Sequence, residues 1–182
     1  MSISQDKKKI LKVLSGAGEP VKLQDIARET GLSVSSSTMH LLWLGKAGYV
    51  STPKKDCYAI TESGREAIGL PKVDKKKASY ILRELPVEKA FHFYTEIGKY
   101  MGVYANSLAD FCEKIQEINP KSIEFHMLRG DFESWLQELG DSGLAEMIGM
   151  IRRMQLSGEK LRKRVYDTVK VRRDELASLS TR

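Results

Sequence analysis

The sequence is poor in the residues that build covalent or thiolate-bound frameworks. Cys57 and Cys112 are the only cysteines in 182 residues, and they lie far apart with no CxxC spacing. We therefore expect neither a disulfide framework nor a thiolate zinc site. A reducing cytoplasm is the compartment that fits this cysteine usage.

Other absences exclude further classes of protein. No hydrophobic run approaches the roughly 20 residues of a membrane-spanning helix, and the basic start of the chain is not followed by the apolar stretch of a secretory signal. Walker and GxGxxG patterns are missing, so no phosphate-cradling loop is expected. We therefore expect a cytoplasmic protein with no membrane partner and no bound cofactor.

Charge is present in plenty but is unevenly distributed. Residues 1–80 carry 14 Lys and Arg against 8 Asp and Glu, a net charge of +6. Residues 81–151 carry 6 against 12, and residues 152–182 carry 10 against 4. Two basic ends thus flank an acidic middle. Basic segments attract phosphate backbones through counterion release, although solvated surface charge gives the same pattern.

The first 70 residues alternate short amphipathic segments with glycine turns. Apolar spacing predicts helices over residues 7–14, 23–30 and 33–47. Gly31 supplies the positive φ of the turn before the third helix, and Ser33 caps that helix. Residues 49–60 predict a β-hairpin with its turn at residues 53–56, and Thr61 caps the helix that follows.

This order of elements, with its residues, resembles a winged helix-turn-helix. The matching segments are DIARETGLS at residues 25–33, His40, Leu41 and Leu44 before KAGYV at 46–50, and YAITESGR at 58–65. The chain over about residues 5–70 is similar to transcription regulators of this class from archaea and bacteria. The fold expected is therefore mainly α with a small β-hairpin wing.

The resemblance implies a surface for duplex DNA. In such proteins the third helix enters the major groove and the hairpin reaches phosphates or the minor groove. Carried over, the DNA-facing positions are Ser35, Ser36, Thr38, Met39, His40 and Trp43 on the third helix, and Lys54 and Lys55 at the wing tip. Lys7, Lys8, Lys9 and Lys12 add a basic surface on the first helix.

One departure from the resembled pattern favours a different function. Residues 33–45 contain no Arg or Lys, although Arg makes the commonest specific base contact. Met39, Leu42 and Trp43 instead place apolar bulk on this helix, and exposed apolar patches usually mark protein contacts. Trp43 packed against the second unit is another interpretation. A protein-docking adaptor of the transcription or replication machinery is thus the alternative, with helix 3 or the acidic middle as the docking surface.

The rest of the chain predicts three parts. Residues 71–80 are interpreted as a basic linker, residues 81–151 as a mostly helical domain, and residues 152–182 as a basic C-terminal helix. Residues 80–82 and 91–94 are ambiguous between strand and helix. The C-terminal helix has a narrow apolar face, which favours pairing with a partner or a second copy, and residues 152–173 offer a further basic arm for DNA.

Four segments of the second part resemble a small domain of archaeal and some bacterial proteins. They are FHFYTEIG at residues 91–98, SIEFH at 122–126, RGDFESW at 129–135 and LGD at 139–141. The resemblance implies a defined domain over about residues 90–150 and gives no chemistry. Within it, Asp131 is interpreted as a helix cap, and Phe132 and Trp135 as core.

His92 and His126 are the only candidates for a metal site. Both sit beside aromatic residues with carboxylates nearby in the sequence, and together they suggest a metal-dependent enzyme as a second alternative. Their separation of 34 positions lacks any HExxH-like spacing, and two structural histidines explain the pattern equally. We expect a non-enzyme: a cytoplasmic, DNA-binding transcription regulator that acts as a homodimer.

Overall fold

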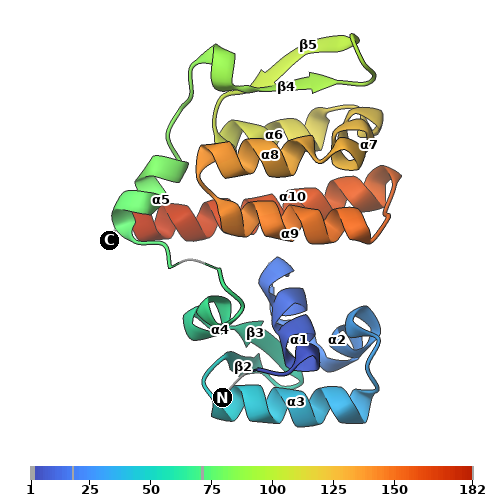
Figure 1. Cartoon of the computed structure of the whole chain (residues 1–182), viewed down its shortest axis with the longest axis vertical. Helices are drawn as coiled ribbons and strands as arrows, with labels where there is room; N and C mark the ends of the chain where they lie inside the picture. The colour runs from blue at the N-terminus through green and yellow to red at the C-terminus, as the bar shows by residue number, and fades with distance from the viewer. Residues whose placement is uncertain (1–2, 18, 71, 182) are drawn as a thin grey trace. The chain divides into compact units, whose positions relative to one another are not determined.

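The computed structural model describes residues 3–17, 19–70 and 72–181. Residues 1, 2, 18, 71 and 182, which fall within the ranges predicted above, lie outside the described residues. The chain divides into two compact units, residues 1–72 and 73–182. Figure 1 shows both units and labels most of their elements.

The first unit has the predicted order of elements. Its helices and strands are α1 (Gln5–Gly16), β1 (Val21–Lys22), α2 (Leu23–Thr30), α3 (Val34–Lys46), β2 (Val50–Lys54), β3 (Cys57–Ile60) and α4 (Glu62–Ala67). The strands form an antiparallel sheet in the order β1-β3-β2. Apolar residues from all three long helices and β2 meet in one core: Ile10, Leu11, Leu14, Ile26, Leu41, Leu44 and Val50.

The turn and cap residues explain why these elements begin and end where they do. Gly31 ends α2 with φ of 71°, and the Ser33 hydroxyl accepts the Ser36 N–H at 3.1 Å to cap α3, as predicted. The Thr61 hydroxyl accepts the Gly64 N–H at 3.1 Å and donates to the Gly48 carbonyl at 2.7 Å. Gly64 has no space for a side chain, because a Cβ there would overlap the carbonyl oxygen of Tyr49. These contacts fasten the end of the hairpin to α3 and α4.

The second unit is mostly helical. Its elements are α5 (Lys75–Ile81), the short 3₁₀ helix η1 (Val87–Lys89), β4 (Phe91–Tyr94), β5 (Tyr100–Ala105), α6 (Leu108–Glu117), α7 (Pro120–Arg129), α8 (Asp131–Leu139), α9 (Ser142–Arg153) and α10 (Gly158–Thr181). Within this unit, Figure 1 shows the β4–β5 hairpin over the layer of α6 to α8, with α5, α9 and α10 beyond. The ambiguous residues 91–94 are thus a strand, and residues 80 and 81 end a helix.

An aromatic cluster occupies the core beneath the hairpin. Phe91 and Phe93 from β4 pack on each other and on Phe111, Phe132 and Trp135, with ring centroids 4.9 to 6.0 Å apart. Phe132 is fully buried and Trp135 is 6% exposed, so both are core residues as predicted. The Trp135 indole N–H donates to the Lys89 carbonyl at 3.0 Å, which satisfies its only polar atom.

Two of the sequence interpretations differ from the structure. Residues 75–80, interpreted as part of a linker, belong to α5, whose Ala78 and Ile81 are fully buried in the core of the second unit. The C-terminal helix α10 is not a separate pairing element, because it packs on α5, α6, α7 and α9. Its narrow apolar face is buried in its own unit through Leu161, Val165, Val169 and Leu176.

A buried ion pair holds α10 to the start of α9. Arg172 donates from Nε and Nη2 to the two Asp141 carboxylate oxygens at 2.7 and 3.0 Å, and Asp141 also caps α9 by accepting the Leu144 N–H at 3.0 Å. Burial alone disfavours the charged guanidinium, but the hydrogen bonds and charge of Asp141 outweigh it, so the pKa of Arg172 is raised. Neither residue is therefore available to bind DNA.

Candidate functional site

The outward face of helix α3 is exposed on the first unit. Its inward side is buried through Ser37, Leu41 and Leu44. On the opposite side Met39 is 65% exposed and Leu42 is 56% exposed. Ser35 and Lys46 are also exposed and fall on the same side at 100° per residue. The described residues of the first unit thus leave this stripe of polar and apolar side chains exposed.

The hydroxyl groups on α3 differ in what they can still bind. Ser35 is exposed and Ser36 is half-buried, and neither hydroxyl has a partner among the described residues. The Thr38 hydroxyl donates to the Val34 carbonyl at 2.8 Å, so its proton is used within the helix and its lone pairs remain as acceptors. Ser35 and Ser36 are thus the more versatile groups for hydrogen bonding to another molecule.

His40 and Trp43 lean toward α1. The His40 Nε2 atom lies 4.0 Å from an Asp6 carboxylate oxygen. The Lys7 ammonium stands 4.5 Å from the centroid of the Trp43 ring, and the centroid of the Tyr49 ring lies 6.3 Å from that of Trp43. Trp43 packs against the core of the first unit, so its partial burial needs no contribution from the second unit. Of the six predicted positions on α3, these two are the most engaged by their own unit.

The wing, which is the β2–β3 hairpin, carries the other predicted residues. All residues from Ser51 to Asp56 are exposed; Lys54 ends β2 and Lys55 lies in the tight turn before β3. Asp56 adopts φ of 58°, and its carbonyl accepts the Leu23 N–H at 3.1 Å, which fastens the turn of the wing to the start of α2. The turn is shorter than predicted, because Pro53 belongs to β2.

The cations of the first unit differ in whether they pair with a carboxylate. Lys9 and Arg28 pair with Asp6 and Asp25 on their own helices at 3.5 and 2.7 Å. Among the described residues, Lys46, Lys54 and Lys55 make no ion pair. Lys46 was missed as a site residue, although its spacing of seven from Met39 places it on the outward stripe. These three lysines are free to neutralise an anion.

The C-terminal basic arm is different, because its cations are used internally. Arg152 pairs with Glu133 at 2.8 Å, and Arg173 pairs with Asp174 at 2.7 Å. Further pairs on α10 join Arg162 to Glu159, Lys163 to Asp167 and Lys170 to Asp174. The positive charge counted over residues 152–173 is therefore largely balanced within the second unit.

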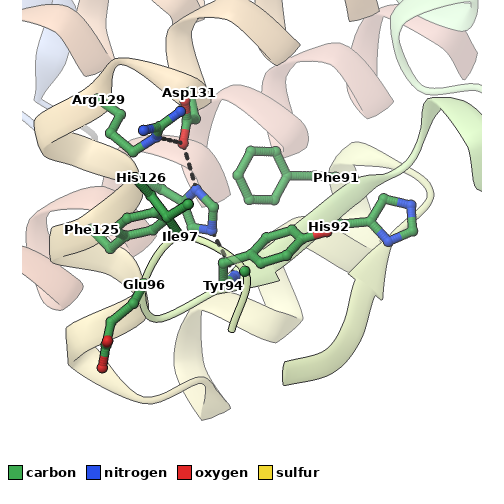
Figure 2. A pocket seen from close by; sticks show the side chains of 10 residues that line it. Phe91, His92, Tyr94, Glu96, Ile97, Phe125, His126, Arg129 and Asp131 are labelled. Carbon is green, nitrogen blue, oxygen red and sulfur yellow. Dashed lines mark hydrogen bonds and ion pairs between the residues drawn. The ribbon is translucent and has the colours of Figure 1, made fainter. Parts of the chain in front are cut away.

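His126 is a structural histidine with both ring nitrogens occupied. Its Nδ1–H donates to an Asp131 carboxylate oxygen at 2.8 Å, and its Nε2 accepts the Tyr94 backbone N–H at 2.8 Å (Figure 2). Burial lowers the pKa of His126 below its ordinary 6.5, against the opposing hydrogen bond and charge of Asp131. A proton or a metal ion at Nε2 would have to displace the Tyr94 N–H.

His92 shares a cavity with His126 but does not form a ligand set with it. The His92 Nε2 atom lies 2.9 Å from the Val87 carbonyl, and Nδ1 lies 3.4 Å from the Tyr100 hydroxyl. The described residues contain no group of three His, Cys, Asp or Glu side chains placed to hold a metal ion. The geometry thus gives no support to the metal-enzyme alternative.

The cavity lies between the β4–β5 turn and α7. It has a volume of about 340 Å³, and Phe91, Tyr94, Ile97, Phe125 and Arg129 are among the residues that line it (Figure 2). Asp131 is not the helix cap that its position suggested. Gly130 occupies the cap position, and the Asp131 carboxylate binds His126 and Arg129 instead. Three segments that carried the second resemblance therefore meet at one cavity.

Comparison with known families gives one match in each unit. Residues 74–170, more than half of the chain, match the family described as "Family of unknown function (DUF5752)". The chain belongs to this family. Residues 4–52 of this DUF5752 protein match the bacterial regulatory protein, arsR family, a helix-turn-helix family. That match implies a DNA-binding transcription regulator. Comparison with curated proteins and with solved structures yields no match.

None of the helices in the described part of the chain combines the length and the apolar composition that crossing a bilayer requires.

Proposed function

We propose that this protein regulates transcription by binding duplex DNA through the outward face of α3 and the wing. The observation that carries the proposal is that Lys46, at the end of α3, and Lys54 and Lys55, at the wing tip, have no carboxylate partner among the described residues. A lysine that pairs with no carboxylate loses no internal partner when it binds a phosphate, and each such contact releases counterions from DNA.

The side chains of the proposed interface have different roles in binding DNA. The three lysines contact phosphates and so set affinity and orientation without reading sequence. Ser35 and Ser36 bond to base edges, and Met39 contacts a thymine methyl group. Because no arginine lies on α3 to form the bidentate contact with guanine, we expect discrimination between DNA sequences to be modest.

Binding to a random duplex at several salt concentrations tests this function. Fluorescence anisotropy of a labelled duplex with the full chain should show an affinity that falls steeply with salt. The slope of log K against log salt should be about −0.9 for each phosphate contacted, so a set of three lysines gives a slope of about −3 per chain. Absence of binding even in dilute buffer would contradict the proposal.

A protein-docking adaptor is the second candidate, and one observation favours it. Val34, Met39 and Leu42 are each about half exposed or more on α3, whereas groove-entering helices are usually polar and basic. An adaptor binds no DNA at physiological salt. The same titration therefore separates the two functions: a salt-dependent isotherm supports the regulator, and a flat response at every salt concentration supports the adaptor.

We further infer that the regulator acts as a cytoplasmic homodimer, because two-fold symmetry doubles the contact with a palindromic site. The apolar face of α10 is buried in its own unit, so the dimer contact uses another surface. Light scattering of the purified full chain measures the state directly. A mass of one chain at micromolar concentration would contradict the dimer and leave the DNA contact itself untouched.

A further inference from the structure

The cavity of the second unit has the form of a small-molecule site. Phe91, Tyr94 and Phe125 give it aromatic walls, and the β4–β5 turn closes one side with Ile97 and Gly98 (Figure 2). Its volume of about 340 Å³ lies in the range of ligand pockets, roughly 300–1,000 Å³. Such sites combine apolar walls with a few polar groups that orient the ligand. The polar groups of this cavity therefore indicate which ligand it would accept.

Most polar groups on the cavity wall are already satisfied by the protein. Both ring nitrogens of His126 are used, by Asp131 and by the Tyr94 N–H. One Asp131 oxygen accepts from His126 at 2.8 Å and from Arg129 Nε at 3.1 Å. The Glu96 carboxylate bonds the Lys99 ammonium at 3.1 Å, and Figure 2 shows it directed away from the other lining residues. These groups hold the wall in place.

Arg129 is a lining cation whose donors are only partly used. Its Nε is bound to Asp131, and its guanidinium carbon lies 5.3 Å from the centroid of the Phe125 ring. Within the described ranges, its two terminal nitrogens have no hydrogen-bond or ion-pair partner. The contacts with Asp131 and Phe125 restrain the guanidinium, so its free edge is presented with little loss of side-chain freedom. Such an edge matches a carboxylate in bidentate geometry.

The cavity also has an apolar side chain, that of Ile97, which is largely exposed to solvent. Ile97 lines the cavity, yet it is 86% exposed at the tip of the β4–β5 turn. Gly98, at φ of 76°, takes the backbone conformation that closes this turn. A flat apolar group between Ile97 and the aromatic walls would cover this side chain. Burial of that surface is favourable in proportion to the area removed from water.

We propose that this cavity binds a small carboxylate with an aromatic or similarly flat apolar body. The carboxylate accepts hydrogen bonds from the terminal nitrogens of Arg129. The body lies against Phe125, Tyr94 and Ile97. Asp131 is a positioning residue, because it holds Arg129 and His126 in place and does not touch the ligand. All residues of this site belong to the second unit, so the test of ligand binding does not depend on whether the first unit binds DNA.

Three probes that share one ring but differ in their head group test the class of ligand. Phenylacetate, 2-phenylethylammonium and 2-phenylethanol are titrated separately into the ¹⁵N-labelled full chain. Phenylacetate should shift the amide signals of Tyr94, Ile97 and Gly98 and bind at least tenfold more tightly than the other two, since a hydrogen bond to a charged group contributes well over that factor. Shifts by none of the probes, or equal or tighter binding of the ammonium or alcohol probe, would overturn the proposal.

Variants at Arg129 test whether this residue binds the carboxylate of the ligand. Arg129→Gln should weaken phenylacetate binding about tenfold or more and change 2-phenylethanol binding by less than about twofold. Arg129→Lys, which keeps the charge but loses the fork, should fall between the two. The matched control is Arg153→Gln, an exposed arginine of α9, which should bind phenylacetate normally. An Arg129→Gln protein with a native amide spectrum and unchanged phenylacetate affinity would also overturn the proposal.

Discussion

The helices α3 and α10 carry the two surfaces that the sequence marks for partners, and they use their side chains in opposite ways. On α3 the outward stripe is exposed, and Lys46 has no carboxylate partner among the described residues. On α10 the apolar face is buried, and most cations pair with carboxylates of the same unit. Counting charge or apolar spacing along the chain does not distinguish these cases. The two cases are distinguished by whether the charged and apolar side chains already have partners within their own unit.

The largest expected effect comes from breaking the internal pairing of α10. Arg172→Leu leaves the Asp141 carboxylate buried without its partner, and removal of one member of a buried pair costs about 3–5 kcal/mol of unfolding free energy. Urea unfolding followed by Trp135 fluorescence, in a Trp43→Phe background, reports on the second unit. Lys170→Ala, which removes a surface pair with Asp174, is the control and should cost less than about 1 kcal/mol. Equal costs would contradict the structural role of Arg172.

The next effect separates the two sides of α3. Leu41 is 2% exposed and the adjacent Leu42 is 56% exposed. Leu41→Ala should destabilise the first unit by about 2–5 kcal/mol because it leaves a cavity in the core, and Leu42→Ala should change stability by about 0.5 kcal/mol or less. Hydrogen exchange of the α1 and α3 amides measures both. A large cost for Leu42→Ala would mean that the outward stripe is packed and not free for a partner.

The smallest effect is a pH dependence confined to the second unit. Because burial lowers the pKa of His126 in the folded chain below 6.5, the unfolded chain binds the proton more readily. Stability is therefore complete above about pH 6.5 and falls as the pH drops through and below that value. Urea midpoints of the second unit between pH 7.5 and 5 should show this fall, and His126→Gln should remove it. The same fall in His126→Gln would assign it to other groups.

The first unit was largely predictable because its signals are local. Turn and cap residues such as Gly31, Ser33 and Thr61 fix their neighbours within three or four positions of the sequence. The wing lysines could also be placed, because a tight turn exposes its residues whatever else the chain does.

The second unit was less predictable because its signals depend on contacts between distant segments. The helix α5 is short and buries only Ala78 and Ile81, so its run of lysines resembled a linker. The burial of α10 requires α5, α6, α7 and α9 to be in place. Arg129 and Asp131 line the cavity beside His126, which in turn accepts the backbone N–H of Tyr94. Tyr94 lies on a strand 32 positions before His126 in the sequence. No periodicity in the sequence encodes that meeting.

The salt dependence of DNA binding by the wing variant tests the central claim most directly. Lys54→Ala combined with Lys55→Ala removes two of the three lysines that are proposed to contact phosphates, and the matched control Lys121→Ala with Lys160→Ala removes two exposed lysines of the second unit. The wing variant should bind every duplex more weakly and should show a slope of log K against log salt that is smaller by about two units. The control should keep the slope of the unmodified chain. Unchanged binding by the wing variant, or an equal loss in the control, would contradict the proposed interface.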